Sequence, residues 1–293
     1  MKRRILALAI IITSLFFIGC SSFSFPFTFT QVSLTTTMPT SRPNTATGTV
    51  TYLEENYDLY SEYRSPSYDL TIDEYNDLLI ASRDLIRRSN IQISATLYEV
   101  RDLIPWGTST TIVALSKGSG VIFMEDETYY YALTNFHVVN DEGYLAEYEI
   151  KTFEDTEFSH AELVAYNETL DLAVIKFSKN NRTEVHLINI EERVYTKFTP
   201  GEFVLAVGNP LSLENNVTFG EFQNLESIAN YEYKAIFHNA TINEGSSGGA
   251  LTDIDANLLG INTWGVEESD EYSFAVPNYI VYMFLVNEGL LNN

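Results

Sequence analysis

The chain has 293 residues, with 17 Lys and Arg against 40 Asp and Glu and a formal net charge of -23 at pH 7. Phosphate backbones repel so acidic a chain, which argues against a nucleic-acid partner. The single cysteine excludes an internal disulfide and a zinc site built from several cysteines, and the four histidines show no metal-ligand spacing. We therefore expect neither a metal ion nor a cofactor.

The beginning of the chain is typical of a signal peptide. Three basic residues at positions 2–4 precede an apolar run from Ile5 to Ile18, which is short for a membrane span. Residues 17–21 (FIGCS) resemble a bacterial lipoprotein signal, in which the cysteine becomes acylated. The resemblance implies a signal peptide over residues 1–19, a lipid on Cys20 and an extracytoplasmic protein anchored to the cell membrane. A secretory signal cleaved nearby is the alternative.

Residues 20–70 are predicted to form a tether. Ser, Thr and Pro make up more than half of residues 21–50, a composition that cannot bury enough surface to fold. From Thr51 the chain becomes acidic and rich in Tyr, and two outcomes are open: this stretch wraps the following domain or stays mobile. Residues 71–89 form a helical lead-in, because Thr71 and Glu74 make a capping box before a helical pattern.

Beyond Asn90 the pattern changes to short β-rich runs separated by turn residues. The predicted strands include 91–100, 120–123, 129–134, 148–153, 172–177, 203–207, 217–222, 258–264 and 274–276. A last apolar stretch predicts a C-terminal helix near 279–288. Many short strands with few helices indicate an all-β barrel or sandwich.

Three segments carry residues suited to nucleophilic catalysis. Residues 245–250 (GSSGGA) place Ser247 between glycines that allow a sharp turn, although such runs are more often flexible loops. His137 follows one apolar strand, and Asp171 begins another. The order His, Asp, Ser is a known chain order for a catalytic triad.

Over roughly residues 90–290 the sequence resembles the trypsin-like serine proteases, most closely their HtrA/Deg branch. The matching pieces are GSGVI (118–122), TNFHVV (134–139), DLAVI (171–175), GEFVLAVGNP (201–210), INEGSSGGAL (242–251), LGINT (259–263) and SFAVP (273–277). The resemblance implies a chymotrypsin/trypsin-like fold of two antiparallel β-barrels, at about 90–190 and 191–293, with the active site between them. The chain ends soon after Pro277, so we expect no peptide-binding PDZ domain.

The resemblance also implies roles for the site residues. His137 would take the proton of Ser247 as its hydroxyl attacks a carbonyl, and Asp171 would orient the imidazole. The backbone N–H groups of Gly245 and Ser247 match the oxyanion hole of the family. Ser246 stands where the relatives usually have Asn and the digestive proteases have Asp, so the activation switch of the latter cannot operate here.

Substrate-binding residues follow from the same match. Thr241 falls where trypsin-type enzymes carry the acidic floor of their specificity pocket, so a preference for Lys or Arg is not implied. Thr263, Trp264 and Gly265 resemble the segment that pairs with the substrate backbone. Core packing of Trp264 is the alternative, and it is equally open.

The sequence thus predicts a membrane-anchored, extracytoplasmic serine endopeptidase that cleaves exposed or unfolded polypeptides. Two alternatives remain: a Glu-specific endopeptidase of the same fold, and an inactive surface lipoprotein that uses the fold as a protein-binding scaffold. The natural substrates, the oligomeric state and the choice between quality control and virulence stay open.

Overall fold

The computed structural model describes residues 56–102, 108–141, 143–180, 182–210, 214–228, 231–266 and 269–291. The predicted signal peptide, the lipid site at Cys20 and the Ser/Thr/Pro-rich stretch lie outside these residues. None of the helices that are described is long and apolar enough to cross a membrane.

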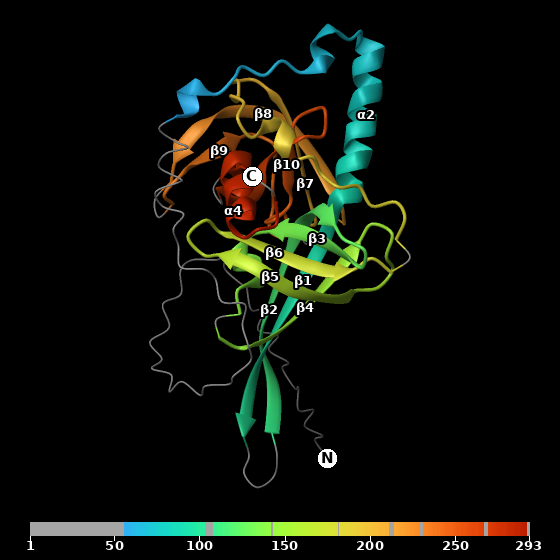
Figure 1. Ribbon diagram of the computed structural model, residues 1–293, viewed down its shortest axis with the longest axis vertical. Helices are drawn as coiled ribbons and strands as arrows, with labels where there is room; N and C mark the ends of the chain where they lie inside the picture. The colour runs from blue at the N-terminus through green and yellow to red at the C-terminus, as the bar shows by residue number, and fades with distance from the viewer. Residues whose placement is uncertain are drawn as a thin grey trace, which may run out of the picture. The chain divides into compact units, whose positions relative to one another are not determined.

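The described strands form two closed antiparallel barrels of six strands each, which confirms the predicted all-β, chymotrypsin-like fold (Figure 1). The first barrel, in the order β1-β2-β3-β6-β5-β4, consists of β1 (Asn90–Asp102), β2 (Thr108–Glu125), β3 (Tyr129–Thr134), β4 (Leu145–Thr152), β5 (Ser159–Asn167) and β6 (Leu172–Ser178). The second, in the order β10-β11-β12-β9-β8-β7, consists of β7 (Phe203–Gly208), β8 (Asn216–Ser227), β9 (Lys234–His238), β10 (Ala250–Thr252), β11 (Leu258–Val266) and β12 (Ser269–Pro277).

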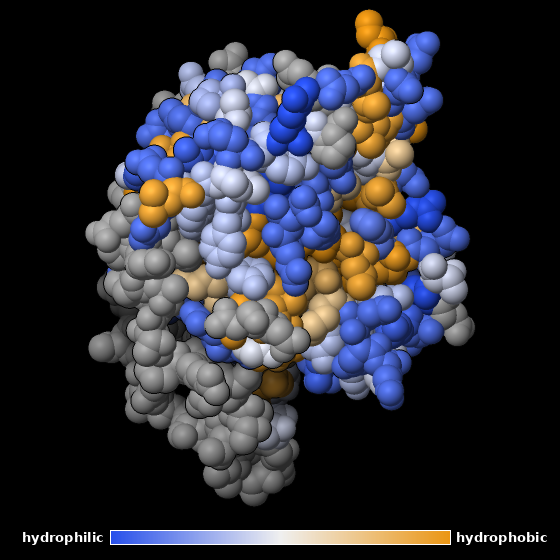
Figure 2. Space-filling view, turned by 45° about the horizontal axis from the view of Figure 1, so that its top comes forward, coloured by the Kyte–Doolittle hydropathy of each residue, from blue (hydrophilic) through white to orange (hydrophobic). Residues whose placement is uncertain are grey.

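Short helices connect and flank the barrels. They are η1 (Tyr57–Leu59), η2 (Pro66–Asp69), α2 (Ile72–Ser89), α3 (Phe136–Val139), η3 (Glu191–Arg193) and α4 (Asn278–Asn287). The Thr71 hydroxyl accepts from the Glu74 N–H while the Glu74 carboxylate accepts from the Thr71 N–H, so the predicted capping box starts α2. Ile72 and Ile80 of this helix are exposed. Figure 2 shows apolar surface at its upper right, where this helix lies.

Each barrel closes around its own apolar interior. Ile93, Ile150 and Ile175 are fully buried in a cluster that belongs to the first barrel. A larger cluster fills the second barrel, includes α4, and extends to residues of β2 and β6. The two barrels therefore share an apolar contact, and the loops at that contact carry the residues of the predicted site.

Three strands were not predicted, and β2, β8 and β12 are much longer than predicted. β5, β9 and β10 were not expected, and β2 begins at Thr108 rather than at residue 120. The first half of β2 is rich in Thr and Ser and largely exposed, so it shows no alternation of buried and exposed residues. β10 has only three residues, which is too short for a periodic signal.

The acidic, Tyr-rich segment wraps the second barrel over residues 56–70, the first of the two outcomes left open. The rings of Tyr57 and Tyr60 pack on Tyr279 of α4 at centroid distances of 6.0 and 5.9 Å. The fully buried Arg193 guanidinium lies 3.8 Å from the centroid of the Tyr63 ring and is paired with Glu202 and Asp253. Aromatic contacts and a cation–π contact with the buried Arg193 thus fasten this segment.

Candidate active site

His137 and Asp171 are joined by three contacts. The His137 Nδ1 lies 2.9 Å from Asp171 Oδ2 and 3.1 Å from Oδ1, and the His137 backbone N–H donates to Oδ1 at 3.0 Å. His137 sits in α3, directly after β3, and its side chain is half exposed. The Asp171 carboxylate therefore fixes both the backbone and the ring of His137, and leaves the Nε2 edge of the imidazole for another partner.

Asp171 is held in an uncommon backbone conformation. Its φ is 52°, in the left-handed region, and its side chain is only 8% exposed. Asn135 Nδ2 donates to the Asp171 carbonyl at 2.9 Å, and Thr263 Oγ1 donates to Asp171 Oδ2 at 2.8 Å. Asp tolerates this conformation better than most residues do, and the contact with Thr263 joins the carboxylate to the second barrel.

Ser247 lies in a tight loop between β9 and β10, and two glycines make the loop possible. Gly245 and Gly248 have φ values of 95° and 86°. A Cβ atom at Gly248 would stand 2.1 Å from the Ser119 carbonyl oxygen. Because the Gly248 N–H donates to Asn262 O and the Asn262 N–H donates to Gly249 O, both at 2.8 Å, the loop is tied to β11. The glycines are thus required by conformation and by close packing.

Ser119 of β2 ties this loop to the first barrel. Its N–H donates to the Ser247 carbonyl and its Oγ to the Gly245 carbonyl, both at 2.7 Å. Its own carbonyl accepts from the Thr134 hydroxyl at 2.7 Å. Two residues of the loop are therefore positioned by hydrogen bonds from one fully buried serine.

The structure brings Ser247 beside the pair of His137 and Asp171 through their shared neighbour Thr263. The Ser247 hydroxyl donates to the Thr263 carbonyl oxygen at 2.7 Å, while the Thr263 side chain holds Asp171. Within the described part of the chain, the hydroxyl makes no hydrogen bond to His137. A rotation about the Ser247 side chain must therefore precede proton transfer to the imidazole.

The loop also offers two backbone donors. Among the described residues, the N–H groups of Gly245 and Ser247 have no hydrogen-bond acceptor, whereas the Ser246 N–H between them donates to Asn243 O at 2.8 Å. Unpaired N–H groups beside a serine hydroxyl can stabilise an oxygen anion. Gly208 allows this approach, because a Cβ there would lie 2.7 Å from Ser246 Cα.

The four residues predicted to bind substrate differ in their surroundings. The side chain of Thr263 is engaged by Asp171, so only its backbone faces Ser247. Trp264 is half-buried and stacks between Tyr231 and Phe274, at 5.0 and 5.3 Å. Thr241 is half-buried, and its carbonyl accepts from Thr218. The edge of β11 opposite β12 has a described strand partner only over Leu258–Ile261, so Gly265 lies beyond that pairing.

A buried histidine lies behind the loop. His238 of β9 is fully buried, and burial lowers its pKa to about 3. The Ala240 backbone and the Asn262 side chain favour the charged form, but neither ring nitrogen has a hydrogen bond of good geometry to a described residue. The ring is therefore neutral at ordinary pH, beside the strand that holds Gly248 and Gly249.

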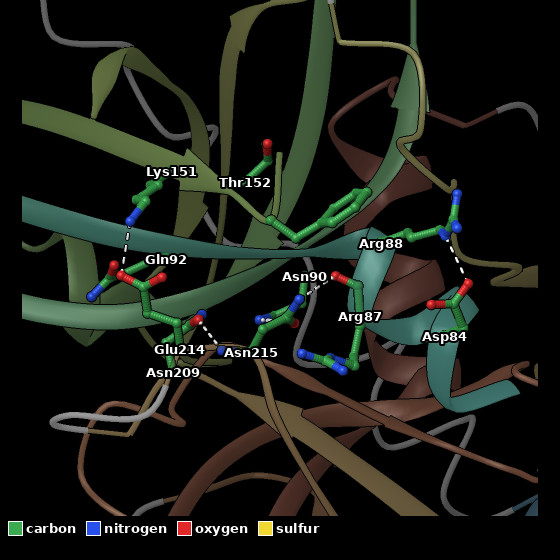
Figure 3. Close-up of a pocket in the computed structure, with 11 residues that line it drawn as sticks. Asp84, Arg87, Arg88, Asn90, Gln92, Lys151, Thr152, Asn209, Glu214 and Asn215 are labelled. Carbon is green, nitrogen blue, oxygen red and sulfur yellow. Dashed lines mark hydrogen bonds and ion pairs between the residues drawn. The ribbon is translucent and has the colours of Figure 1, made fainter. Parts of the chain in front are cut away.

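A polar pocket of about 330 Å³ lies where α2 meets β1 and the start of β8 (Figure 3). Its lining residues are Asp84, Arg87, Arg88, Asn90, Gln92, Lys151, Thr152, Phe153, Asn209, Glu214 and Asn215. Asn209 connects it to the site, because its N–H donates to Ser119 Oγ at 2.8 Å while its Oδ1 accepts from the Asn215 N–H. The pocket does not include His137, Asp171 or Ser247.

Sequence reasoning missed Ser119, Asn209 and the role of the Thr263 hydroxyl. Ser119 and Asn209 lie within the GSG and GNP pieces, so their positions were noticed but not their function. Their hydrogen bonds cross between strands far apart in the sequence, and no local pattern reports them. Among the described residues, no group of three or more His, Cys, Asp or Glu side chains could hold a metal ion.

Comparison with known proteins agrees with this geometry. Residues 118–261 match the family model of the trypsin-like peptidase domain. Over 179 residues the chain is 33% identical to serine protease HTRA1 of Xenopus tropicalis, covering 59% of this chain and 36% of that protein. Over 173 residues it is 32% identical to the serine protease Do-like HtrA of Bacillus subtilis, covering 55% and 37%. The chain thus spans about a third of the length of these relatives.

A solved structure gives the same result. The serine endoprotease from Yersinia pestis superposes with a TM-score of 0.53 at 30% sequence identity, over 71% of this chain and 66% of that chain. Because the superposition covers 71% of this chain, it extends beyond residues 118–261 to other parts of the two barrels. Residues 118–261 thus match a trypsin-like peptidase domain, and over 55–59% of its length the chain is similar to serine proteases of the HtrA type.

Proposed function

We propose that the protein is a serine endopeptidase that hydrolyses peptide bonds of exposed or unfolded polypeptides. One observation carries the proposal: the imidazole of His137 is hydrogen-bonded to Asp171, beside the loop that presents Ser247 and two N–H groups with no acceptor among the described residues. The printed names of the relatives, serine protease and serine endoprotease, support the same reaction.

The residues define the order of events. Asp171 accepts a hydrogen bond from the Nδ1–H of His137 and remains a carboxylate, so Nε2 is the nitrogen that takes the proton of Ser247. The hydroxyl leaves the Thr263 carbonyl, turns to Nε2 and attacks the substrate carbonyl carbon. The new oxyanion accepts from the N–H groups of Gly245 and Ser247, and His137 then returns the proton to the leaving amine. Water hydrolyses the acyl-enzyme by the same steps.

Residues 263–265 have no strand partner on this edge among the described residues, and substrate addition there would place the acyl side of the scissile bond next to Ser247. Trp264 closes this region with a stack of aromatic rings, and the residue at the trypsin specificity position is Thr241 rather than a carboxylate. We propose small or aliphatic side chains before the scissile bond. Mapping cleavage sites on a denatured protein mixture tests this preference directly.

We also propose an extracytoplasmic location with a lipid anchor on Cys20. The FIGCS sequence at residues 17–21 supports this proposal, as does the basic and apolar segment before it. Radiolabelled palmitate should be incorporated into the full chain but not into a Cys20→Ser variant. Incorporation into both, or recovery of the wild-type protein in the soluble fraction, would contradict the anchor.

Digestion of unfolded casein tests the central claim. The full chain should cleave casein, and Ser247→Ala should not. A fluorophosphonate probe should label the wild-type protein on Ser247, because the reaction requires an activated hydroxyl. Equal cleavage by both proteins, or neither cleavage nor labelling, would overturn the proposal and favour a fold retained as a binding scaffold.

A further inference from the structure

Within the described part of the chain, one edge of β2 has no strand partner over most of its length. β1 pairs with β2 from Thr108 to Val121, but on the other side β3 pairs only from Val121 to Glu125. Among the described residues, no backbone or side-chain group hydrogen-bonds to that second side between Ser109 and Lys117. We call this stretch the free edge of β2. In Figure 1 the paired β1 and β2 extend beyond the other strands of the first barrel.

The free edge leads directly to the nucleophile loop. The Ser119 N–H points away from β1, because it donates to the Ser247 carbonyl at 2.7 Å. Alternate residues of a strand direct their backbone groups to the same side, and the pairing with β1 is regular from residue 114 to 121. The N–H and C=O groups of Lys117 and Leu115 therefore point to the free edge. At about 3.4 Å per residue, Leu115 lies roughly 14 Å from Ser119 along the strand.

The side chains along this edge are apolar and unprotected. Ile112, Val113 and Leu115 are 56%, 42% and 66% exposed. From Thr108 to Ser116 the strand contains neither a charged residue nor a proline. Proteins usually guard an exposed edge with such residues, because an unguarded edge pairs with another extended chain. The free edge is thus suited to an extended, apolar polypeptide.

The contacts of Ser247 with two different strands indicate in which direction this polypeptide binds. The Ser247 hydroxyl contacts Thr263, whereas its carbonyl contacts Ser119. If the acyl side of the substrate follows residues 263–265, the leaving-group side continues onto β2. A second copy of this chain is a poorer occupant, since a net charge of -23 makes two copies repel each other.

We propose that the free edge of β2 binds the leaving-group side of an unfolded substrate as an added strand and favours apolar residues there. This proposal rests on the proposed endopeptidase function. Leu115 lies about four residues from Ser119, so the contact begins several residues beyond the scissile bond. The site selects long, extended and apolar chains over short peptides, and thereby distinguishes unfolded polypeptides from exposed loops of folded proteins.

The test uses two quenched fluorescent peptides with identical residues around the scissile bond. One carries about three residues on the leaving-group side, and the other about twelve apolar and uncharged residues. The wild-type KM should be about tenfold lower for the long peptide, which corresponds to a few strand hydrogen bonds and apolar contacts. An equal extension on the acyl side should have no such effect. Equal KM values for the long and short peptides would overturn the proposal.

Two variants locate the effect. Leu115→Pro removes an N–H that points away from β1, so the pairing with β1 is kept while the free edge is interrupted. Leu115→Thr keeps the strand preference and removes the apolar contact. Both should raise the KM of the long peptide towards that of the short one, without changing cleavage of the short peptide. Leu145→Thr, at an exposed leucine of β4, is the matched control and should change neither value.

A binding measurement separates this proposal from the catalytic one. Fluorescence anisotropy of the long peptide on Ser247→Ala should show binding that Leu115→Pro weakens about tenfold, even if the wild-type protein proves inactive. Binding unaffected by Leu115→Pro would overturn the proposal. The proposal would also be overturned if β2 served another partner. In that case Leu115→Pro would abolish dimers seen in light scattering, or binding to phosphatidylcholine vesicles, and would leave peptide binding unchanged.

Discussion

The two barrels hold their parts of the site by different means. The first barrel fixes His137 with a carboxylate that binds both its ring and its backbone. The second barrel holds Ser247 through backbone hydrogen bonds of the loop around it, and the hydroxyl itself faces a carbonyl rather than the imidazole. The proton acceptor is therefore oriented in advance, whereas the nucleophile depends on the geometry of its loop and on one side-chain rotation.

The largest effect is expected in the first barrel, from Asp171→Asn. Asn tolerates the φ of 52° as well as Asp does, so the backbone should be kept while the negative charge is lost. The amide no longer favours the His137 tautomer that accepts the serine proton, and kcat on casein or a peptide should fall on the order of 10⁴-fold. Ser247→Ala gives the floor of the assay, and a loss below tenfold would show that Asp171 does not orient the imidazole.

Gly248→Ala tests the second barrel through its backbone. The new Cβ would stand 2.1 Å from the Ser119 carbonyl oxygen, and the φ of 86° is strained for any side chain. The free energy of unfolding should fall by about 3 kcal/mol or more, and fluorophosphonate labelling of Ser247 should be lost.

Gly143→Ala is the matched control for that change. Gly143 has nearly the same φ, 84°, but a Cβ there would meet nothing within 4 Å. The free energy of unfolding should fall by only about 1 kcal/mol, because the backbone conformation alone is strained, and fluorophosphonate labelling of Ser247 should persist. Chemical denaturation of both variants measures the difference. Equal destabilisation would mean that the contact with Ser119 contributes nothing.

This contrast also explains how much of the site the sequence could predict. His137, Asp171 and Ser247 lie at the ends of recognisable strands or in a glycine-rich turn, so order and local pattern were sufficient to propose them. Thr263 was proposed as a substrate contact, yet its hydroxyl binds Asp171 from the other barrel. That contact joins residues 92 positions apart, and only the packing of one barrel on the other creates it.

The same reasoning applies to the fold. β3 and α2 were predicted with their observed bounds, or nearly so. Apolar residues on the buried side mark β3, and capping residues mark the start of α2. The first half of β2 was missed because a strand that projects from its barrel has no buried side to impose an alternation. This half of β2 is a strand because β1 continues beside it and pairs with it. The sequence of β2 alone does not report that pairing.

A smaller effect, dependent on pH, is expected from His238. Its pKa of about 3 in the fold lies below the ordinary value of 6.5, so the unfolded chain takes up a proton that the fold excludes. The resulting stability is fully present above pH 6.5 and is lost as the pH falls from there towards 3. Between pH 7 and 5 the loss should be on the order of 2 kcal/mol.

His238→Gln should reduce this loss, measured as the difference in unfolding free energy between pH 7 and 5. The replacement cannot be charged, so the remaining pH dependence comes from other groups. The matched control is His160→Gln, which makes the same replacement at an exposed histidine of β5 and leaves the buried ring in place. The same slope in wild type and His238→Gln would show that the buried ring does not exclude the proton.

The smallest effect is expected where the two barrels meet, at Thr263. Thr263→Val keeps the carbonyl that accepts from Ser247 and removes only the hydroxyl that donates to Asp171 Oδ2 at 2.8 Å. One hydrogen bond to a buried carboxylate corresponds to roughly a tenfold loss of kcat, with KM little changed. Thr263→Ser restores the donor and should recover the rate. A rise in KM without a loss of kcat would instead make Thr263 a substrate contact, because a group that only positions Asp171 acts on the chemical step and not on binding.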